Sequence, residues 1–532
     1  MITMTGTTGM AAPSSGTSVL TNAVTANGVM QHLAQLQKIS DNNGGTRASG
    51  TPGFTASMDY IQGLLDRAGY RTSRQSFLFN AFDELAPSVF ERVSPTARAY
   101  VEGEDFFSAE YSGSGNVTAA IQAVDVVMPP GATASASSSG CETTDFAGFV
   151  TGRIALVQRG TGDFVVKAEN AENAGAAGVI IYNEGTPGAP DRNDTLNPTL
   201  GDAADVDIPV IGTSFAVGAE LYNLTLQGPV SVHLQTTTRI RTNVPTQNLI
   251  ADSPTGRRNQ TVMAGAHLDS VPEGAGIEDN GTGSAALLEI ALQLRKTGTA
   301  PRDNIRFAWW GAEEAGLVGS TRYVTSLTPS QLSDIDLYLN YDMIGSPNFG
   351  RFIYDGDGSA FGLRGPNGSE SIEAVFEQFF SSAGLVSEPT AFDGRSDYDA
   401  FIDNGIPAGG LFTGAEDPKS AAQVSRYGGL ATFDGSPVAF DPCYHQACDS
   451  LDPIGDGADA RLYRALDRAY GGALKWQGTI SNVNQTALGQ MSDAAAYAIL
   501  TFAMQDASVK NNGNGTANAA TGGTALGHHD KR

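Results

Sequence analysis

Two adjacent glutamates, Glu313 and Glu314, end the apolar stretch IRFAWWGA, and several other apolar stretches also end in acids or histidines. The residues that share this placement outside the glutamate pair are His267, Asp269, Asp279, Asp342 and His445. Five carboxylates gathered in a partly dry site repel one another strongly, so a positive charge has to lie among them. A divalent metal ion supplies that charge, and imidazole combined with carboxylate suits Zn²⁺. These residue types therefore predict a catalytic zinc site.

Two zinc ions can share one bridging carboxylate, which gives each ion one histidine, one private carboxylate and the bridge. We assign the first ion to His267, Asp342 and Asp279. We assign the second ion to His445, Glu314 and Asp279. Asp279 is then the bridge, and this set predicts two Zn²⁺ per chain.

Two acids are left over, and each has a function beside the metals. Asp269 follows His267 by two residues, so it can accept the second ring N–H of that histidine and orient the ring. Glu313 adjoins the ligand Glu314 without binding metal, so it can act as the general base on metal-activated water. Taken alone, a pair of glutamates is most often the solvated start of a helix. The catalytic interpretation is favoured only because other segments also end in acids or histidines.

The segments that must position these residues alternate between strand and helix from residue 248 onward. QTVMAGAHLDS, NIRFAWWGA and LYLNYDMIG have the composition of buried strands, and GTGSAALLEIALQLRKTG and SESIEAVFEQFFSSAG have helical periodicity. This order predicts an α/β fold whose mixed, mostly parallel sheet has helices on both faces. Ligands of such sheets bind beyond the carboxyl ends of the strands, where the acids and histidines lie.

Composition sets limits on the domain organisation and on the partners. A chain of 532 residues is too long for one core. We expect a disordered segment at 1–24, a first part of the main domain at 25–110, a β-rich insert at 111–240, the catalytic part at 241–506 and a disordered tail at 507–532. The net charge of −25 argues against nucleic-acid binding. No stretch predicts a transmembrane helix, and the first residues lack the pattern of a signal peptide.

Three cysteines are too few for a disulfide scaffold. Cys443 and Cys448 flank His445, and the pair leaves three possibilities open: free thiols, a metal site or a small local disulfide. Cys141 stands alone in the insert.

Five motifs together resemble the co-catalytic zinc aminopeptidases of peptidase family M28, and in particular their secreted actinobacterial and aminopeptidase Y-like members. The motifs are GAHLDSV, DNGTGSAALLEIA, WWGAEEAGLVGS, LNYDMIG and YHQACD. The segment GRIALVQRGTGDFVVKAENAENAGAAGVIIYNEG resembles a protease-associated (PA) domain. The resemblance implies a zinc-dependent exopeptidase fold with an inserted PA domain, and a cis peptide bond between Asp279 and Asn280.

The resemblance also implies several roles outside the metal ligands. Tyr444 would stabilise the tetrahedral intermediate, and Arg395, within FDGRSDYDAF, would contact the substrate. A Cys443–Cys448 disulfide and export from the cell follow from the same likeness, whereas Cys141 lacks the partner that PA domains of this type often have. Some relatives bind calcium, but no Ca²⁺ site can be located in the sequence.

The function expected from these features is hydrolysis of the N-terminal residue from peptides with a free α-amine. The family likeness suggests a preference for large apolar residues such as leucine, and we expect a secreted monomer that binds peptide or protein N-termini and neither nucleic acid nor membranes. Three alternatives remain: a carboxypeptidase, a glutaminyl cyclase on the same fold, or an inactive zinc-binding relative.

Overall fold

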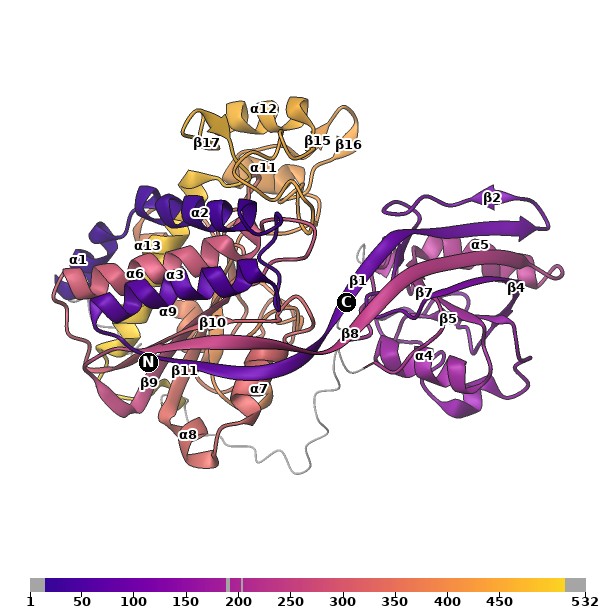
Figure 1. The fold of residues 1–532 in the computed structure, drawn as a ribbon, viewed down its shortest axis with the longest axis horizontal. Helices are drawn as coiled ribbons and strands as arrows, with labels where there is room; N and C mark the ends of the chain where they lie inside the picture. Colours follow the sequence, from indigo (N-terminus) through magenta and orange to yellow (C-terminus); the bar gives the residue numbers. More distant parts are fainter. Residues whose placement is uncertain (1–14, 188–191, 202–203, 512–532) are drawn as a thin grey trace, which may run out of the picture.

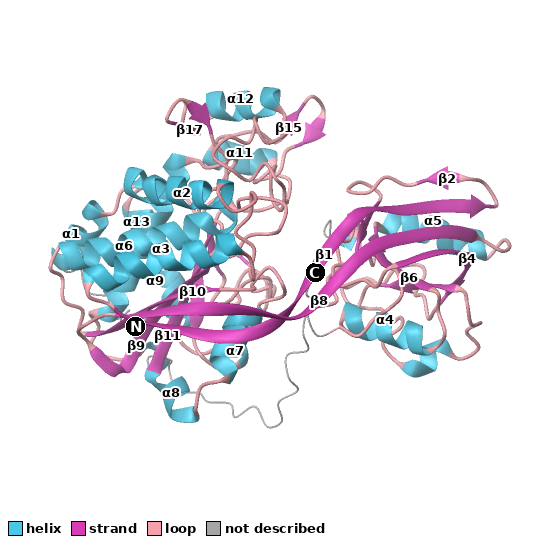
Figure 2. Ribbon diagram, viewed as in Figure 1, coloured by secondary structure: helices cyan, strands magenta, loops and turns pink. Residues whose placement is uncertain are grey.

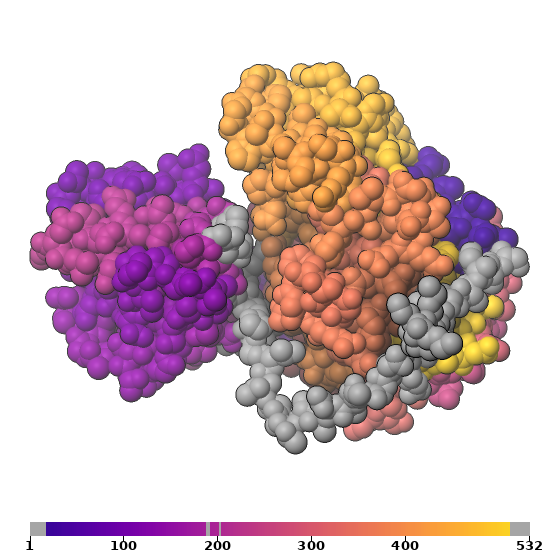
Figure 3. All heavy atoms as spheres, turned by 180° about the vertical axis from the view of Figure 1, so that it is seen from behind, coloured from indigo at the N-terminus to yellow at the C-terminus, as the bar shows by residue number. Residues whose placement is uncertain are grey.

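The computed structural model describes residues 15–187, 192–201 and 204–511. The chain forms a helix-rich main lobe and a smaller inserted lobe (Figure 1). Two long strands, β1 (Arg71–Ser94) and β8 (Ser231–Asp252), pair antiparallel and run from one lobe into the other. Seen from behind, the inserted lobe lies beside the main lobe (Figure 3).

The sheet of the main lobe has the strand order β13-β12-β14-β11-β9-β10-β8, with β1 beyond β8. Its strands other than β1 and β8 are β9 (Arg257–His267), β10 (Asp303–Trp310), β11 (Ile335–Tyr341), β12 (Phe352–Tyr354), β13 (Glu388–Thr390) and β14 (Ala408–Phe412). The four central strands β14, β11, β9 and β10 are parallel, and β8 and β12 run antiparallel to their neighbours β10 and β14. This confirms the predicted mixed, mostly parallel sheet.

Helices cover both faces of this sheet, as Figure 2 shows. One face packs against α1 (Ser15–Ala23), α2 (Ala26–Asp41), α3 (Pro52–Ala68), α6 (Gly283–Lys296), α9 (Ser369–Ser382) and α13 (Gln485–Ala503). The other face packs against α7 (Val318–Thr325), α8 (Pro329–Asp334) and α10 (Asp399–Asp403).

Strand β10 shows why the strand sequences are continuously apolar. Phe307 and Trp309 lie in the core on the α6 side, and Ala308 and Trp310 lie in the core on the α7 side. Successive side chains of a strand point to opposite faces, so a strand buried on both faces has no polar alternation.

The inserted lobe is a second, smaller α/β unit whose strands follow β8 in the order β4-β5-β6-β7-β3. Its elements are β2 (Arg98–Ala99), β3 (Phe106–Ser108), β4 (Gly115–Ala123), the 3₁₀ turn η1 (Thr143–Phe146), β5 (Ile154–Gln158), α4 (Phe164–Asn173), β6 (Gly178–Tyr182), β7 (Val210–Thr213) and α5 (Phe215–Thr225).

The remaining elements lie above the main lobe in Figure 1 or at the end of the chain. They are α11 (Ala421–Tyr427), β15 (Thr432–Phe433), β16 (Ser436–Pro437), α12 (Ala460–Ala469), β17 (Lys475–Trp476), β18 (Thr479–Ile480) and the 3₁₀ turn η4 (Val509–Asn511). None of the helices in the described part of the chain combines the length and the apolarity that crossing a bilayer requires.

Two expectations about disorder need correction within the described residues. The segment 1–24 was expected to be disordered, but α1 forms from residue 15 because Leu20 packs into the core without exposed surface. The first residues of the expected tail, 507–511, are ordered, because Val509 packs into the same core and is 1% exposed. Residues 1–14 and 512–532 lie outside the described residues.

The expected start of the insert at residue 111 also differs from the structure. The second half of β1 already pairs with the inserted-lobe half of β8, and β3 pairs with β7. The register of β1 against β8 shifts between Phe79 and Ala81, so the chain leaves the main lobe about there. A single long strand that serves two sheets has no break in composition to mark the crossing.

Candidate active site

Three adjacent parallel strands end at the same edge of the main sheet, and each delivers candidate ligands there. His267 is the last residue of β9 and is paired with Trp310, the last residue of β10. Glu313 and Glu314 follow β10 after a short turn, and Asp342 follows β11. The structure therefore brings together the residues that the sequence placed at strand ends.

Asp279 reaches the same point from the turn ahead of α6. It lies in a one-turn π-helix, η3 (Ile277–Thr282), and its peptide bond to Asn280 is cis, as the family likeness implies. The carboxylate of Asp449 accepts the backbone N–H groups of Glu278 at 2.8 Å and of Asp279 at 2.9 Å. These bonds fix the backbone that carries Asp279.

His445 lies on a small loop that a disulfide between Cys443 and Cys448 closes. Its backbone has φ +54, in the left-handed region that non-glycine residues seldom adopt. The disulfide decides among the three possibilities for this cysteine pair. Cys141 has no disulfide partner, as expected.

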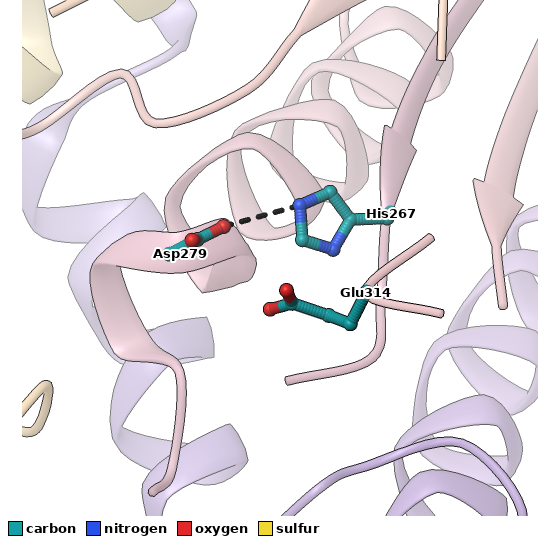
Figure 4. A group of neighbouring side chains, drawn as sticks. All are labelled: His267, Asp279 and Glu314. Atoms are coloured by element: carbon teal, nitrogen blue, oxygen red, sulfur yellow. Dashed lines mark ion pairs between the residues drawn. The ribbon is translucent and has the colours of Figure 1, made fainter. Parts of the chain in front are cut away.

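Asp279 lies between the two histidines and presents one oxygen to each. Its Oδ1 is 3.1 Å from Nε2 of His267, and its Oδ2 is 3.3 Å from Nε2 of His445. Asp342 Oδ1 is 3.2 Å from Nε2 of His267, and Glu314 Oε2 is 3.1 Å from Nε2 of His445. Figure 4 shows His267, Asp279 and Glu314 pointing toward a common centre. The residues of each predicted ligand set therefore lie close together, and their binding of metal stays a prediction.

Glu313 lies beside these groups, with Oε2 3.8 Å from Nε2 of His267. Asp269 contacts His267 differently from the expectation: its backbone carbonyl lies 3.1 Å from Nδ1 of His267, whereas its carboxylate is 3.8 Å away. The carboxylate instead accepts the backbone N–H of Glu313 at 3.4 Å. Asp269 therefore orients the ring through its main chain, and its side chain holds the turn that carries the glutamate pair.

Tyr444 and Arg395 both line the same pocket as the ligands. The ring of Tyr444 stacks on that of His445 at 3.9 Å between centroids. Arg395 donates from one guanidinium nitrogen to both oxygens of Glu416 at 3.1 Å. Burial lowers the pKa of Arg395, but Glu416 and the other groups that surround it together raise that pKa overall.

The site fits a metal ion on the chemistry of its own residues. Burial raises the pKa of Glu314 to about 7 and the pKa of Glu313 well above its usual range. Burial opposes charge on His267 and His445 too, yet the surrounding acids raise the pKa of both. Among the described residues, Glu314 Oε1 has no hydrogen-bond partner although it is buried. Crowded acids and an orphaned acceptor are what a coordinated cation relieves.

Several polar residues of the pocket were not named as site residues by the sequence prediction. Ser396 donates to Oδ2 of Asp342 at 2.5 Å. Glu110, Asn197 and Thr199 belong to the inserted lobe and line the pocket from the other side. Ser396 lies in the segment FDGRSDYDAF, next to Arg395. No motif marks the three inserted-lobe residues, because only the packing of the two lobes brings them into the pocket.

Histidines and carboxylates grouped around a shared aspartate, at the carboxyl ends of parallel strands and beside an additional glutamate, are an arrangement typical of metallohydrolases. Residues 248–468 match the model of peptidase family M28, and residues 122–221 match that of the PA domain.

An aminopeptidase of Pseudomonas aeruginosa is 47% identical over 442 residues, which cover 82% of this chain and 79% of the relative. Leucine aminopeptidase 2 of Trichophyton rubrum is 45% identical over 331 residues, 62% of this chain and 64% of the relative. The solved aminopeptidase from Aneurinibacillus sp. strain AM-1 has a similar fold, with a TM-score of 0.64 and 23% identity over 91% of this chain and 95% of that one.

The chain therefore belongs to peptidase family M28 and carries a PA domain. The predictions of a metallo-aminopeptidase and of a zinc-exopeptidase fold with an inserted PA domain are confirmed at the level of enzyme class and architecture.

Proposed function

We propose that the chain removes the N-terminal residue from peptides with a free α-amine, and that it uses two Zn²⁺ ions. The observation that carries the proposal is Asp279, which directs one carboxylate oxygen at each of two histidines. Asp342 and Glu314 complete the two groups of ligands. When bound in these groups, zinc would polarise the scissile carbonyl and activate water as a nucleophile.

Glu313 is the general base in this proposal. Its carboxylate adjoins the ligand groups, with Oε2 3.8 Å from Nε2 of His267. It takes a proton from the attacking water and returns it to the amine that leaves.

Tyr444 donates its hydroxyl hydrogen to the oxygen that becomes negative during attack. Its ring stacks on His445, so the hydroxyl stays beside the second ligand group. Burial raises its pKa well above the usual range, which keeps the phenol protonated as a donor.

The charge of the pocket favours a free α-amine over a free carboxylate as the recognised terminus. Among the described residues that line the pocket, Arg395 is the single arginine or lysine, and it is paired with Glu416. A carboxypeptidase needs a cation for the terminal carboxylate, and here that cation is already engaged. A glutaminyl cyclase would use one zinc, whereas the two clusters of histidine and carboxylate support two.

Side-chain preference, location and assembly are also parts of the proposal. Tyr354, Ala391 and Phe412 line one side of the pocket, which supports a large apolar first residue such as leucine. The Cys443–Cys448 disulfide supports an oxidising compartment outside the cytoplasm. We propose a monomer, and the acidic cluster Asp355, Asp357 and Glu373 is not assigned to calcium.

The test compares leucine 4-nitroanilide with its N-acetyl derivative while zinc is measured on the same sample. We expect hydrolysis of the free-amine substrate alone and two zinc ions per chain. The variant Glu313→Gln should retain both ions and lose at least about 10²-fold in kcat. The exposed Glu377→Gln on α9 is the matched control and should behave as the wild type. Equal cleavage of both substrates would refute the aminopeptidase assignment.

A further inference from the structure

The inserted lobe supplies part of the pocket wall, and that wall carries a carboxylate. Glu110, two residues beyond β3, lines the pocket together with Asn197 and Thr199. Its backbone is fixed on both sides: its N–H donates to the carbonyl of Pro198 at 2.9 Å, and its carbonyl accepts the N–H of Leu200 at 3.0 Å. A carboxylate on so constrained a backbone has a defined position relative to the ligands.

Glu110 lies on the His445 side of the pocket. It interacts electrostatically with His445, and its side chain bonds to Thr199. Glu273, from the loop after β9, interacts electrostatically with both His445 and Glu110. The lining next to the second ligand group therefore includes the carboxyl group of Glu110, and that of Glu273 lies close to it.

The wall next to the first ligand group is partly apolar. Ser396 donates to Asp342 there, and Met343 follows Asp342 directly in the chain. The apolar lining residues Tyr354, Ala391 and Phe412 come from β12, the segment just after β13, and β14, which are neighbours in the sheet. This wall suits the apolar side chain of the first substrate residue.

An aminopeptidase binds one residue ahead of the scissile bond. The rest of the bound peptide therefore has to extend out of the pocket on the side opposite the first side chain. In this pocket that side is the wall formed by the inserted lobe. We propose, on the basis of the aminopeptidase function above, that Glu110 determines specificity for the second residue of the peptide. Its carboxylate attracts a lysine or arginine at that position and repels an aspartate or glutamate.

The experiment measures kcat/KM of the zinc-loaded enzyme on three dipeptide amides, leucyl-lysine, leucyl-glutamine and leucyl-glutamate. We expect the wild type to prefer lysine over glutamate about tenfold, the effect of one partly desolvated charge pair. Glu110→Gln should lower this ratio about fivefold, and Glu110→Lys should invert it. Glu104→Gln is the matched control, because Glu104 is an exposed glutamate of the same lobe that does not line the pocket.

The outcomes separate this inference from the function on which it rests. A wild type that fails to cleave leucine 4-nitroanilide refutes the aminopeptidase proposal and this inference with it. Cleavage of the anilide together with a lysine-to-glutamate ratio that Glu110→Gln leaves unchanged overturns the inference alone. An equal loss on all three peptides in Glu110→Gln also overturns it, because the carboxylate would then bind the α-ammonium group instead. A ratio that falls in Glu110→Gln but stays at the wild-type value in Glu104→Gln supports it.

Discussion

Substitution of Asp449 is the most direct test of how the proposed bridging residue, Asp279, is positioned. The carboxylate of Asp449 contacts the site through backbone groups. It accepts the backbone N–H groups of Glu278 and Asp279. Its Oδ1 also accepts Nδ2 of Asn482 at 2.8 Å. The substitution Asp449→Asn keeps the size of the side chain and removes one acceptor oxygen.

The arrangement of donors decides which hydrogen bond the variant loses. Both the N–H of Glu278 and the amide of Asn482 point at Oδ1 of Asp449, so the remaining oxygen has to stay there. The new NH₂ group then faces the N–H of Asp279, whose bond is lost. A hydrogen bond to a charged group contributes about 1.5–3 kcal/mol, which corresponds to about a 10- to 100-fold loss in zinc affinity if the bond serves the metal-binding geometry.

The assay is zinc content after dialysis against a graded series of chelator concentrations, with the melting temperature recorded in parallel. We expect Asp449→Asn to release zinc at about 10- to 100-fold lower chelator concentration and to lose activity in step with the metal. The control Asp452→Asn changes an exposed neighbouring acid and should match the wild type. A lower melting temperature with unchanged zinc affinity would refute the argument, because Asp449 would then support the fold and not the site.

Three further predictions concern the metal, the disulfide and a buried acid. Chelation should abolish cleavage of leucine 4-nitroanilide, and added Zn²⁺ should restore it. Replacing Cys443 and Cys448 by serine opens a loop with a sequence separation of 5 and should cost about 2 kcal/mol in unfolding free energy, with a loss of activity because Tyr444 and His445 lie inside the loop. Burial raises the pKa of Asp493 on α13 to about 6. Its ionised carboxylate therefore lowers the free energy of unfolding above pH 6, whereas below about pH 4 the group is protonated in both states and has no such effect. Asp493→Asn should therefore raise unfolding free energy by about 1 kcal/mol at pH 7, after allowance for partial exposure, and by nothing at pH 4; melting curves at both values check this.

The part of the site that follows the strands could be predicted from the sequence. His267, Asp342 and the glutamate pair end apolar stretches, and adjacent parallel strands bring such ends together without any further information. Asp279 and His445 lie on loops, and only their residue types and the family motifs indicated that they join the others. The structure brings Asp279 and His445 within 3.3 Å of each other, and no periodicity in the sequence predicts this contact.

The features that the sequence did not predict depend on contacts between distant segments. Asp269 was expected to orient His267 through its carboxylate, but the local turn places its carbonyl there instead. Helix α1 has a weakly apolar sequence and is ordered because Leu20 packs in the core with α13. Glu110 and His445 lie far apart in the sequence, and no motif around either residue predicts that the two come close together.

The packing of the inserted lobe explains why it belongs to the active site and is not a detachable module. One buried cluster contains Tyr111 of the inserted lobe together with Ala312 and Ala315 of the main lobe, which flank the pair Glu313 and Glu314. The hydroxyl of Tyr111 donates to the carbonyls of Asn80, at 2.9 Å, and Ala315, at 3.4 Å.

These contacts join the point where β1 changes lobes to the turn that carries the proposed base. Removal of the lobe would expose that apolar cluster and release the turn on one side. The same cluster places the lobe firmly enough for a carboxylate at residue 110 to act at a fixed distance from the ligands. The position of the base and selection of the second residue would thus depend on one interface, and a variant that loosens this interface should impair both together.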